Sequence, residues 1–111
     1  MFLVETISPE NFFSSNLIDE ISLKLNDLTS IDLSYQELTS INKNCFNGLI
    51  NLKSIDLSEN ELTFIEANIF NGLINLVQID LSCNQLANLD SKLFKGLTNL
   101  MELHLNDNKL L

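Results

Sequence analysis

The amino-acid sequence predicts an α/β solenoid, in which similar units stack to form a parallel sheet on one side and loops or short helical turns on the other. Three observations lead to this prediction. Leucines recur at intervals of 24 residues along most of the chain, the segments between them align without gaps, and each segment contains one short stretch of alternating polar and apolar residues. A fixed period of this length is typical of stacked repeat architectures. The 111 residues therefore form one array rather than two domains.

The repeat occupies residues 28–51, 52–75 and 76–99, and a partial fourth unit covers residues 100–111. Each full unit reads Leu-x-x-Ile-x-Leu-x-x-Asn-x-Leu-x-x-Ile/Leu-x-x-x-x-Phe-x-Gly-Leu-x-Asn, except that the first unit has Gln36 where the others have asparagine. Three periods without an insertion make coincidence implausible.

The alternating stretches predict strands, because alternation gives a strand one buried and one exposed face. They lie at residues 30–34, 54–58, 78–82 and 102–106. Strands that recur in the same direction form a parallel sheet, and the residues between them make the crossovers. Each crossover returns apolar side chains to the core, including a phenylalanine stripe that we interpret as a packed spine: Phe46, Phe70 and Phe94. One unit cannot bury its apolar face alone, so the stacked units share a continuous core.

Asparagine is abundant, with 16 residues in the chain, and three of these follow the strands at the same bend: Asn60, Asn84 and Asn108. An amide side chain offers donors and an acceptor, so a stack of them can satisfy backbone groups that would otherwise be buried unpaired. Gln36 is one methylene longer, and we expect a looser bend in the first unit.

The segments LKSIDLSENELTFIEANIFNGLIN and LVQIDLSCNQLANLDSKLFKGLTN resemble leucine-rich repeats of the 24-residue "typical" class, and the resemblance covers residues 28–111. It implies a horseshoe with a parallel sheet on the concave side and a non-enzymatic role in binding other proteins, most often in extracellular receptors and matrix proteins. The chain lacks the cysteine-rich caps of such arrays, any Asn-x-Ser/Thr sequon and a visible signal peptide. An extracellular or cell-surface location and a cytoplasmic one therefore both stay open.

The two ends differ from the repeat. Residues 1–27 have enough apolar content to form an N-terminal capping segment, with a helix that starts near Ser8-Pro9-Glu10 as the first interpretation and a strand over residues 21–25 as the alternative. The C-terminal end has no capping sequence after Asn108. Three explanations are compatible with this: a fragment of a longer array, a homodimer formed through the open end, or a frayed end.

Composition excludes several classes of function. Acidic residues outnumber basic ones 15 to 6, for a net charge of −9, which argues against nucleic acid as a partner. The apolar runs are too short for a transmembrane helix. The only histidine is His104, so no catalytic triad is predicted, and we expect neither an enzyme nor a cofactor. Cys45 replaces a core residue and Cys83 a surface residue, so we expect both thiols to be free and neither to bind a metal.

The exposed positions of the predicted strands form the candidate binding face. Asp32, Asp56, Asp80 and His104 occupy one column, and Tyr35, as the single tyrosine, is the best candidate for an anchor residue. The residues that we expect to contact a partner are Asp32, Tyr35, Asp56, Glu59, Asp80, Glu102 and His104. This acidic face predicts a protein or peptide partner with a basic surface. The alternatives are a solvated stripe on a structural spacer without a ligand and, less favoured, a cation site.

Overall fold

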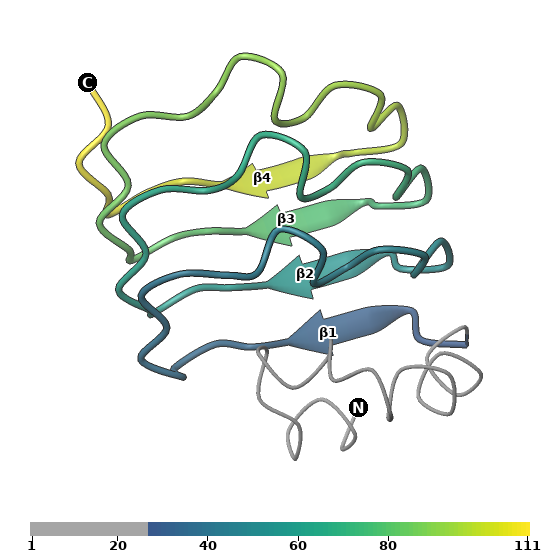
Figure 1. The fold of residues 1–111 in the computed structure, drawn as a ribbon, viewed down its shortest axis with the longest axis horizontal. Helices are drawn as coiled ribbons and strands as arrows, with labels where there is room; N and C mark the ends of the chain where they lie inside the picture. The colour runs from purple at the N-terminus through teal and green to yellow at the C-terminus, as the bar shows by residue number, and fades with distance from the viewer. Residues whose placement is uncertain (1–26) are drawn as a thin grey trace.

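A computed structural model describes residues 27–111, which form four short strands in one parallel sheet (Figure 1). The strands are β1 (Ser30–Asp32), β2 (Ser54–Asp56), β3 (Gln78–Asp80) and β4 (Glu102–His104). They lie in sequence order, with Ile31 opposite Ile55, Ile55 opposite Ile79, and Ile79 opposite Leu103. Residues that are 24 positions apart in the chain are thus paired in the sheet. The capping segment predicted for residues 1–27 lies outside the described residues, apart from Asp27.

The strands have one buried face, as the alternation predicts. Ile31, Ile55 and Ile79 are at most 1% exposed, and the leucines two residues further on are buried beside them. Backbone hydrogen bonds continue just past the strand ends, where the Leu33 N–H donates to the Asp56 carbonyl at 2.8 Å. The equivalent bonds repeat in the next two units, so neighbouring units share the same backbone geometry.

The return path of each unit consists of hydrogen-bonded turns over residues 43–48, 67–72 and 91–96, with no helix in the part of the chain that the structure describes. Each turn ends in a Phe-x-Gly-Leu segment in which the leucine N–H donates to the phenylalanine carbonyl at 3.2 Å. The glycines have φ of 79°, 80° and 83°, the left-handed region in which a side chain would be strained. A positive φ at the third residue of such a turn is the type II geometry.

The phenylalanine stripe forms the predicted spine across these turns. The ring centroids of Phe46 and Phe70 are 6.1 Å apart and those of Phe70 and Phe94 are 6.2 Å apart, with nearly parallel ring planes. Phe46 and Phe70 are fully buried, whereas Phe94 is partly exposed because no further unit covers it within the chain.

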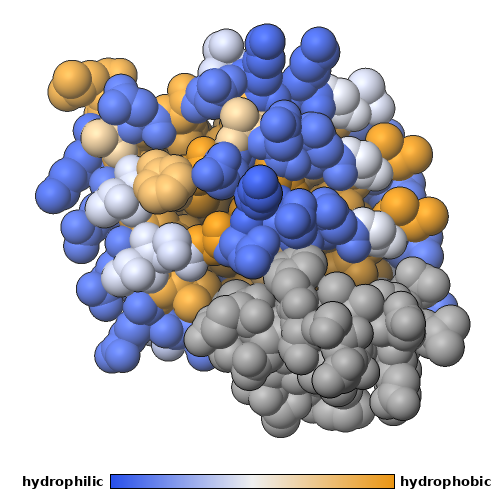
Figure 2. All heavy atoms as spheres, in the orientation of Figure 1, coloured by the Kyte–Doolittle hydropathy of each residue, from blue (hydrophilic) through white to orange (hydrophobic). Residues whose placement is uncertain are grey.

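The C-terminal end of the stack exposes apolar side chains. Leu103 is 37% exposed at the position where the other strands have fully buried isoleucine, and Met101 is 82% exposed. Leu111 is also fully exposed, and Figure 2 shows apolar spheres at the upper left, where Figure 1 places the C-terminus. Among the described residues, no helix is long and apolar enough to cross a membrane.

Candidate binding face

The bends that carry the exposed face are held by buried asparagines. Asn84 is 7% exposed, and its Nδ2 donates to the carbonyls of Leu57, Leu81 and Ser82 at 3.0–3.1 Å. Its Oδ1 accepts from the Leu62 N–H at 3.1 Å, so one side chain ties together backbone from two adjacent units. Asn60 and Asn108 repeat this arrangement. These amides satisfy backbone groups that the stack removes from water.

The first bend differs, because Gln36 does not take the buried position of the asparagines. Its side chain is exposed and, among the described residues, donates to the Ser34 carbonyl at 3.1 Å. Glu37 adopts a positive φ of 57°, which the equivalent residues of the next two units do not. The main chain therefore follows a different path at the first bend than at the later ones. That the first bend is also looser stays a prediction from the longer side chain of Gln36.

A second asparagine ladder lies at the end of each repeat, and sequence reasoning did not assign it a role. Asn75 Nδ2 donates to the Ile50 carbonyl at 2.7 Å, and Asn99 Nδ2 donates to the Ile74 carbonyl at 2.8 Å. The signal for it was present in the sequence, since asparagine closes all three full units. We call the solvent-facing side of the sheet the concave face. The two asparagine ladders connect adjacent units on either side of the strands that form this face.

The first column of the concave face is a row of residues in direct register. Asp32 pairs with Asp56, Asp56 with Asp80, and Asp80 with His104. The sequence prediction therefore places these four side chains together correctly. Asp32 and His104 are exposed, and Asp56 and Asp80 are partly exposed.

Each aspartate of this column also has a structural contact that the sequence analysis did not foresee. Asp56 Oδ1 accepts hydrogen bonds from the Ser58 N–H at 2.9 Å and from the Ser58 hydroxyl at 2.6 Å. Asp32 with Ser34 and Asp80 with Ser82 show the same two distances. One carboxylate oxygen thus stabilises the strand end. The other oxygen, Oδ2, accepts no hydrogen bond among the described residues. The serines of the three units thus hold the aspartates in place.

A second column follows the strands, and all four of its residues have a left-handed backbone. Tyr35, Glu59, Cys83 and Asp107 have φ between 56° and 59°. Left-handed backbone is unfavourable for residues other than glycine, asparagine and aspartate, so the repeat imposes it on Tyr35, Glu59 and Cys83. Tyr35 is 72% exposed, as an anchor residue requires.

Cys83 lies between two acidic members of this column. Its Sγ is 3.7 Å from Asp107 Oδ2. A hydrogen bond to Glu59 raises the pKa of the Cys83 thiol, and burial and the negative charges of Glu59 and Asp107 raise it further. Cys45 is buried in the core, where desolvation raises its pKa to about 12. Both thiols are free, as the sequence predicts.

The last strand contributes the remaining predicted contacts. His104 Nε2 is 3.4 Å from Glu102 Oε2, with both side chains about half exposed. Within residues 27–111, no group of three or more His, Cys, Asp or Glu side chains is arranged to hold a metal ion. The cation-site alternative therefore has no ligand set in this part of the chain.

Comparison with known proteins agrees with this architecture. The leucine rich repeat family matches residues 26–86 and 74–111. The structure of the Toll–Spatzle complex from Drosophila matches with 34% identity and a TM-score of 0.73, covering 76% of this chain and 11% of that one. The leucine-rich repeat domain of APL1B matches with 17% identity and a TM-score of 0.61, covering 88% and 37%. No curated protein matches the chain. The chain thus spans only a minor part of the structures that it resembles.

Proposed function

Because the chain belongs to the leucine-rich repeat family, whose domains commonly mediate protein–protein interactions, we propose that its concave face binds a protein or peptide with a basic surface. The function is recognition rather than catalysis. The residues that make the contacts are Asp32, Tyr35, Asp56, Glu59, Asp80, Glu102 and His104.

The row of aspartates is the observation that supports this proposal most strongly. Asp32, Asp56 and Asp80 stand in register, each with one oxygen bonded to a serine and the other without a hydrogen-bond partner within residues 27–111. Parallel strands lie about 4.8 Å apart, so the row presents closely spaced negative charge from a rigid platform. Closely spaced like charges repel one another, and a cationic partner relieves that repulsion.

Two further features support a protein partner. Tyr35 offers a large exposed aromatic surface beside the carboxylates, and tyrosine is enriched among residues that dominate binding energy. In the matched structure, Toll is in a complex with Spatzle. Charge complementarity would act mainly on the rate of association and make it sensitive to salt.

The test neutralises the face without disturbing the strand ends. The triple variant Asp56→Asn, Glu59→Gln, Asp80→Asn removes three charges and keeps an amide oxygen that can accept from Ser58 and Ser82. Peptides selected from a displayed library against the unmodified chain serve as the probe. We expect the selected peptides to be rich in Lys and Arg and to bind the triple variant at least about tenfold more weakly, a loss of about 1.4 kcal/mol.

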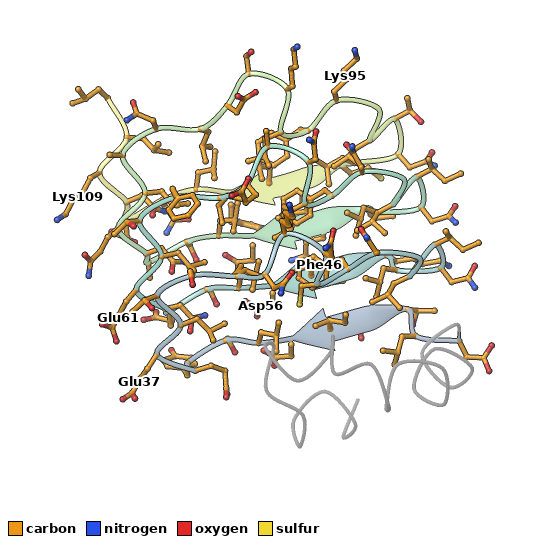
Figure 3. All side chains as sticks on the ribbon, viewed as in Figure 1. Glu37, Phe46, Asp56, Glu61, Lys95 and Lys109 are labelled. Atoms are coloured by element: carbon orange, nitrogen blue, oxygen red, sulfur yellow. The ribbon has the colours of Figure 1, made fainter. Side chains whose placement is uncertain are left out.

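A matched control removes the same charge elsewhere. The control variant combines Glu37→Gln, Glu61→Gln and Glu66→Gln. These side chains are exposed and make no hydrogen bond among the described residues. Figure 3 shows Glu37 and Glu61 on the edge beyond the strand ends. If both triple variants bind the selected peptides equally weakly, the loss of affinity comes from the net charge of the chain, and the proposal that the concave face makes the contacts is wrong. If no library peptide binds the concave face, the alternative of a structural spacer gains support.

We also propose that the open C-terminal end mediates self-association. Met101, Leu103 and Leu111 expose apolar surface there, whereas the isoleucines at the equivalents of Leu103 are fully buried within the stack. Exposed apolar surface favours contact with a second copy because burial removes it from water.

A further inference from the structure

Two asparagines on the convex turns are each followed by glycine, and these are the only Asn-Gly pairs in the chain. Asn47 precedes Gly48 and Asn71 precedes Gly72, both within the type II turns described above. In each case the asparagine is exposed, and so is the glycine. The third unit has Lys95 before Gly96 in the same turn, so the pair occurs in only two units.

Asparagine can lose its side-chain ammonia when the backbone nitrogen of the next residue attacks the side-chain carbonyl carbon. The reaction requires a small following residue, since a side chain would block the attack, and a following N–H that is not held by another hydrogen bond. Glycine meets the first condition. The second is also met, because within residues 27–111 neither the Gly48 nor the Gly72 N–H makes a hydrogen bond.

Two neighbouring asparagines fail both conditions. Asn44 is followed by Cys45, whose N–H donates to the Asn42 carbonyl at 2.9 Å. Asn68 is followed by the β-branched Ile69, whose N–H donates to the Glu66 carbonyl at 3.1 Å. Both asparagines are also exposed to water, so they differ from the Asn-Gly pairs in the residue that follows and in its backbone nitrogen.

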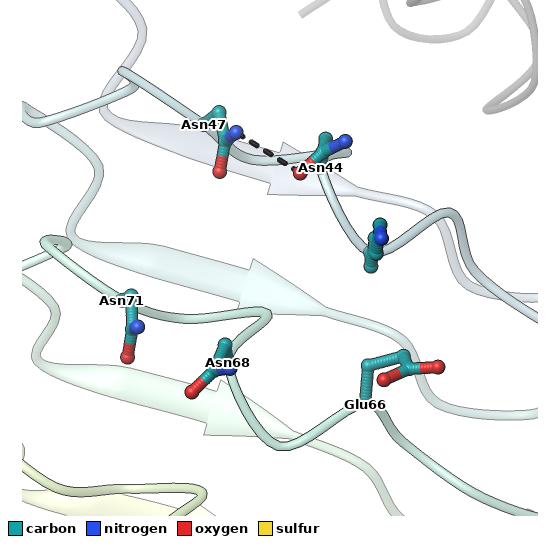
Figure 4. Close-up of a pocket in the computed structure, with 6 residues that line it drawn as sticks. Asn44, Asn47, Glu66, Asn68 and Asn71 are labelled. Carbon is teal, nitrogen blue, oxygen red and sulfur yellow. Dashed lines mark hydrogen bonds between the residues drawn. The ribbon is translucent and has the colours of Figure 1, made fainter.

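All four asparagines line the same open cavity of about 340 Å³, which lies between the first two convex turns. Lys43 and Glu66 complete its lining, and Figure 4 shows the asparagines of the two turns on either side. Asn47 Nδ2 donates to Asn44 Oδ1 at 3.2 Å, while the side chain of Asn71 makes no hydrogen bond among the described residues. Because the cavity is open, water reaches both reactive side chains. The Asn47 amide is held by its hydrogen bond to Asn44, whereas the Asn71 amide has no such bond among the described residues.

We propose that Asn47 and Asn71 deamidate spontaneously in the folded protein. The glycine nitrogen forms a bond to the asparagine Cγ and loses its proton, and the Cγ–Nδ2 bond breaks to release ammonia. Water then opens the resulting succinimide at either carbonyl, which yields aspartate or isoaspartate. The net change is asparagine plus water to acid plus ammonia, without an oxidant or a cofactor.

The modification changes the convex surface. Each event replaces a neutral amide by a carboxylate in a cavity that already contains Glu66. Isoaspartate also lengthens the main chain inside the turn that positions Phe46 or Phe70 in the core. The concave face lies on the other side of the unit, so the modification is independent of the proposed partner binding.

Peptide mapping by mass spectrometry tests the proposal. The full chain is incubated folded at mildly alkaline pH and sampled over time. We expect the peptides with Asn47 and Asn71 to gain the mass difference between an amide and an acid, with isoaspartate as the larger product, and Asn71 to react first. Asn44 and Asn68 are internal controls within the same cavity and are expected to stay unchanged.

The variant Asn47→Lys with Asn71→Lys copies the sequence of the third unit, which already holds lysine before glycine in this turn. It is expected to abolish isoaspartate formation in the two turns. The proposal is wrong if Asn47 and Asn71 stay intact while an unstructured peptide of residues 44–50 deamidates under the same conditions. It is also wrong if Asn44 and Asn68 react as fast as the Asn-Gly pairs.

Discussion

The asparagine residues fall into groups that differ in burial and in the backbone around them. Asn60 and Asn84 are buried and bond to the main chain of two units. Asn47 and Asn71 are exposed and precede a glycine whose N–H makes no hydrogen bond in the described part of the chain. The same side chain therefore stabilises the stack in one position and is chemically labile in another. Its fate depends on the backbone and not on the residue type.

Cys83 gives a prediction at the scale of a single residue. The thiolate is the reactive form of cysteine, and the raised pKa reduces its fraction below that pKa. We expect iodoacetamide to modify Cys83 more slowly than an unstructured thiol peptide at mildly alkaline pH, and the difference to shrink as the pH rises. Glu59→Gln is expected to speed the reaction, since an amide accepts a hydrogen bond less strongly than a carboxylate and carries no charge.

The control for this measurement is Glu61→Gln, which removes one charge two residues further along the chain. An equal acceleration in both variants would contradict a specific effect of Glu59. Cys45 should stay unmodified in the folded protein, because it is buried and its pKa is about 12.

At the scale of the elements, three-residue strands are too short to hold a sheet by themselves, and the bends supply the remaining contacts. The first three strands end in aspartate and the fourth in His104, and each is followed by leucine, serine or asparagine, a left-handed residue, and asparagine or its replacement Gln36. The asparagine ladder connects adjacent bends, so the stability of one unit depends on its neighbours.

Removal of one ladder amide tests this dependence. Asn84→Ala leaves the carbonyls of Leu57 and Leu81 and the Leu62 N–H without their side-chain partner. We expect the free energy of unfolding to fall by about 2–3 kcal/mol, because unpaired buried polar groups are costly. Gln36→Ala at the equivalent exposed position is expected to change it by less than about 0.5 kcal/mol. Urea denaturation measures both, and equal effects would contradict the assigned role of the ladder.

At the scale of the whole molecule, the last of the described units buries its apolar residues least. Leu103 and Phe94 are more exposed than the residues that precede them by one period, because nothing within the chain covers them. The charge is also uneven: residues 52–75 contain four acids and one lysine, whereas residues 76–99 contain two of each. The open end is thus apolar and lies next to a unit without net charge.

This arrangement predicts self-association through the open end. Sedimentation velocity is expected to show a mass that rises with concentration, and Met101→Lys with Leu111→Lys is expected to suppress the rise. Both side chains are at least 82% exposed, so the change does not touch the core. Ile50→Lys, which replaces an exposed isoleucine in the first unit, should leave association unchanged. A single-chain mass at every concentration would contradict the proposal.

Much of the fold follows from the sequence, because the period and the alternation leave one arrangement that buries the apolar residues. The strand positions, the parallel direction, the register and the phenylalanine spine all come from these two patterns. The column of Asp32, Asp56, Asp80 and His104 also follows from them, since residues one period apart must become neighbours in the sheet.

The sequence by itself thus determined which residues lie side by side, because a repeat of constant length fixes neighbours by number. Only the tertiary structure decided which of their atoms remain available. The path of the main chain in space sets the hydrogen bonds from Ser58 to one oxygen of Asp56 and the left-handed backbone of Glu59. It also leaves the Gly48 N–H without a hydrogen bond within residues 27–111. Periodicity carries no information about that path, and it is that path which sets the chemistry of each exposed group.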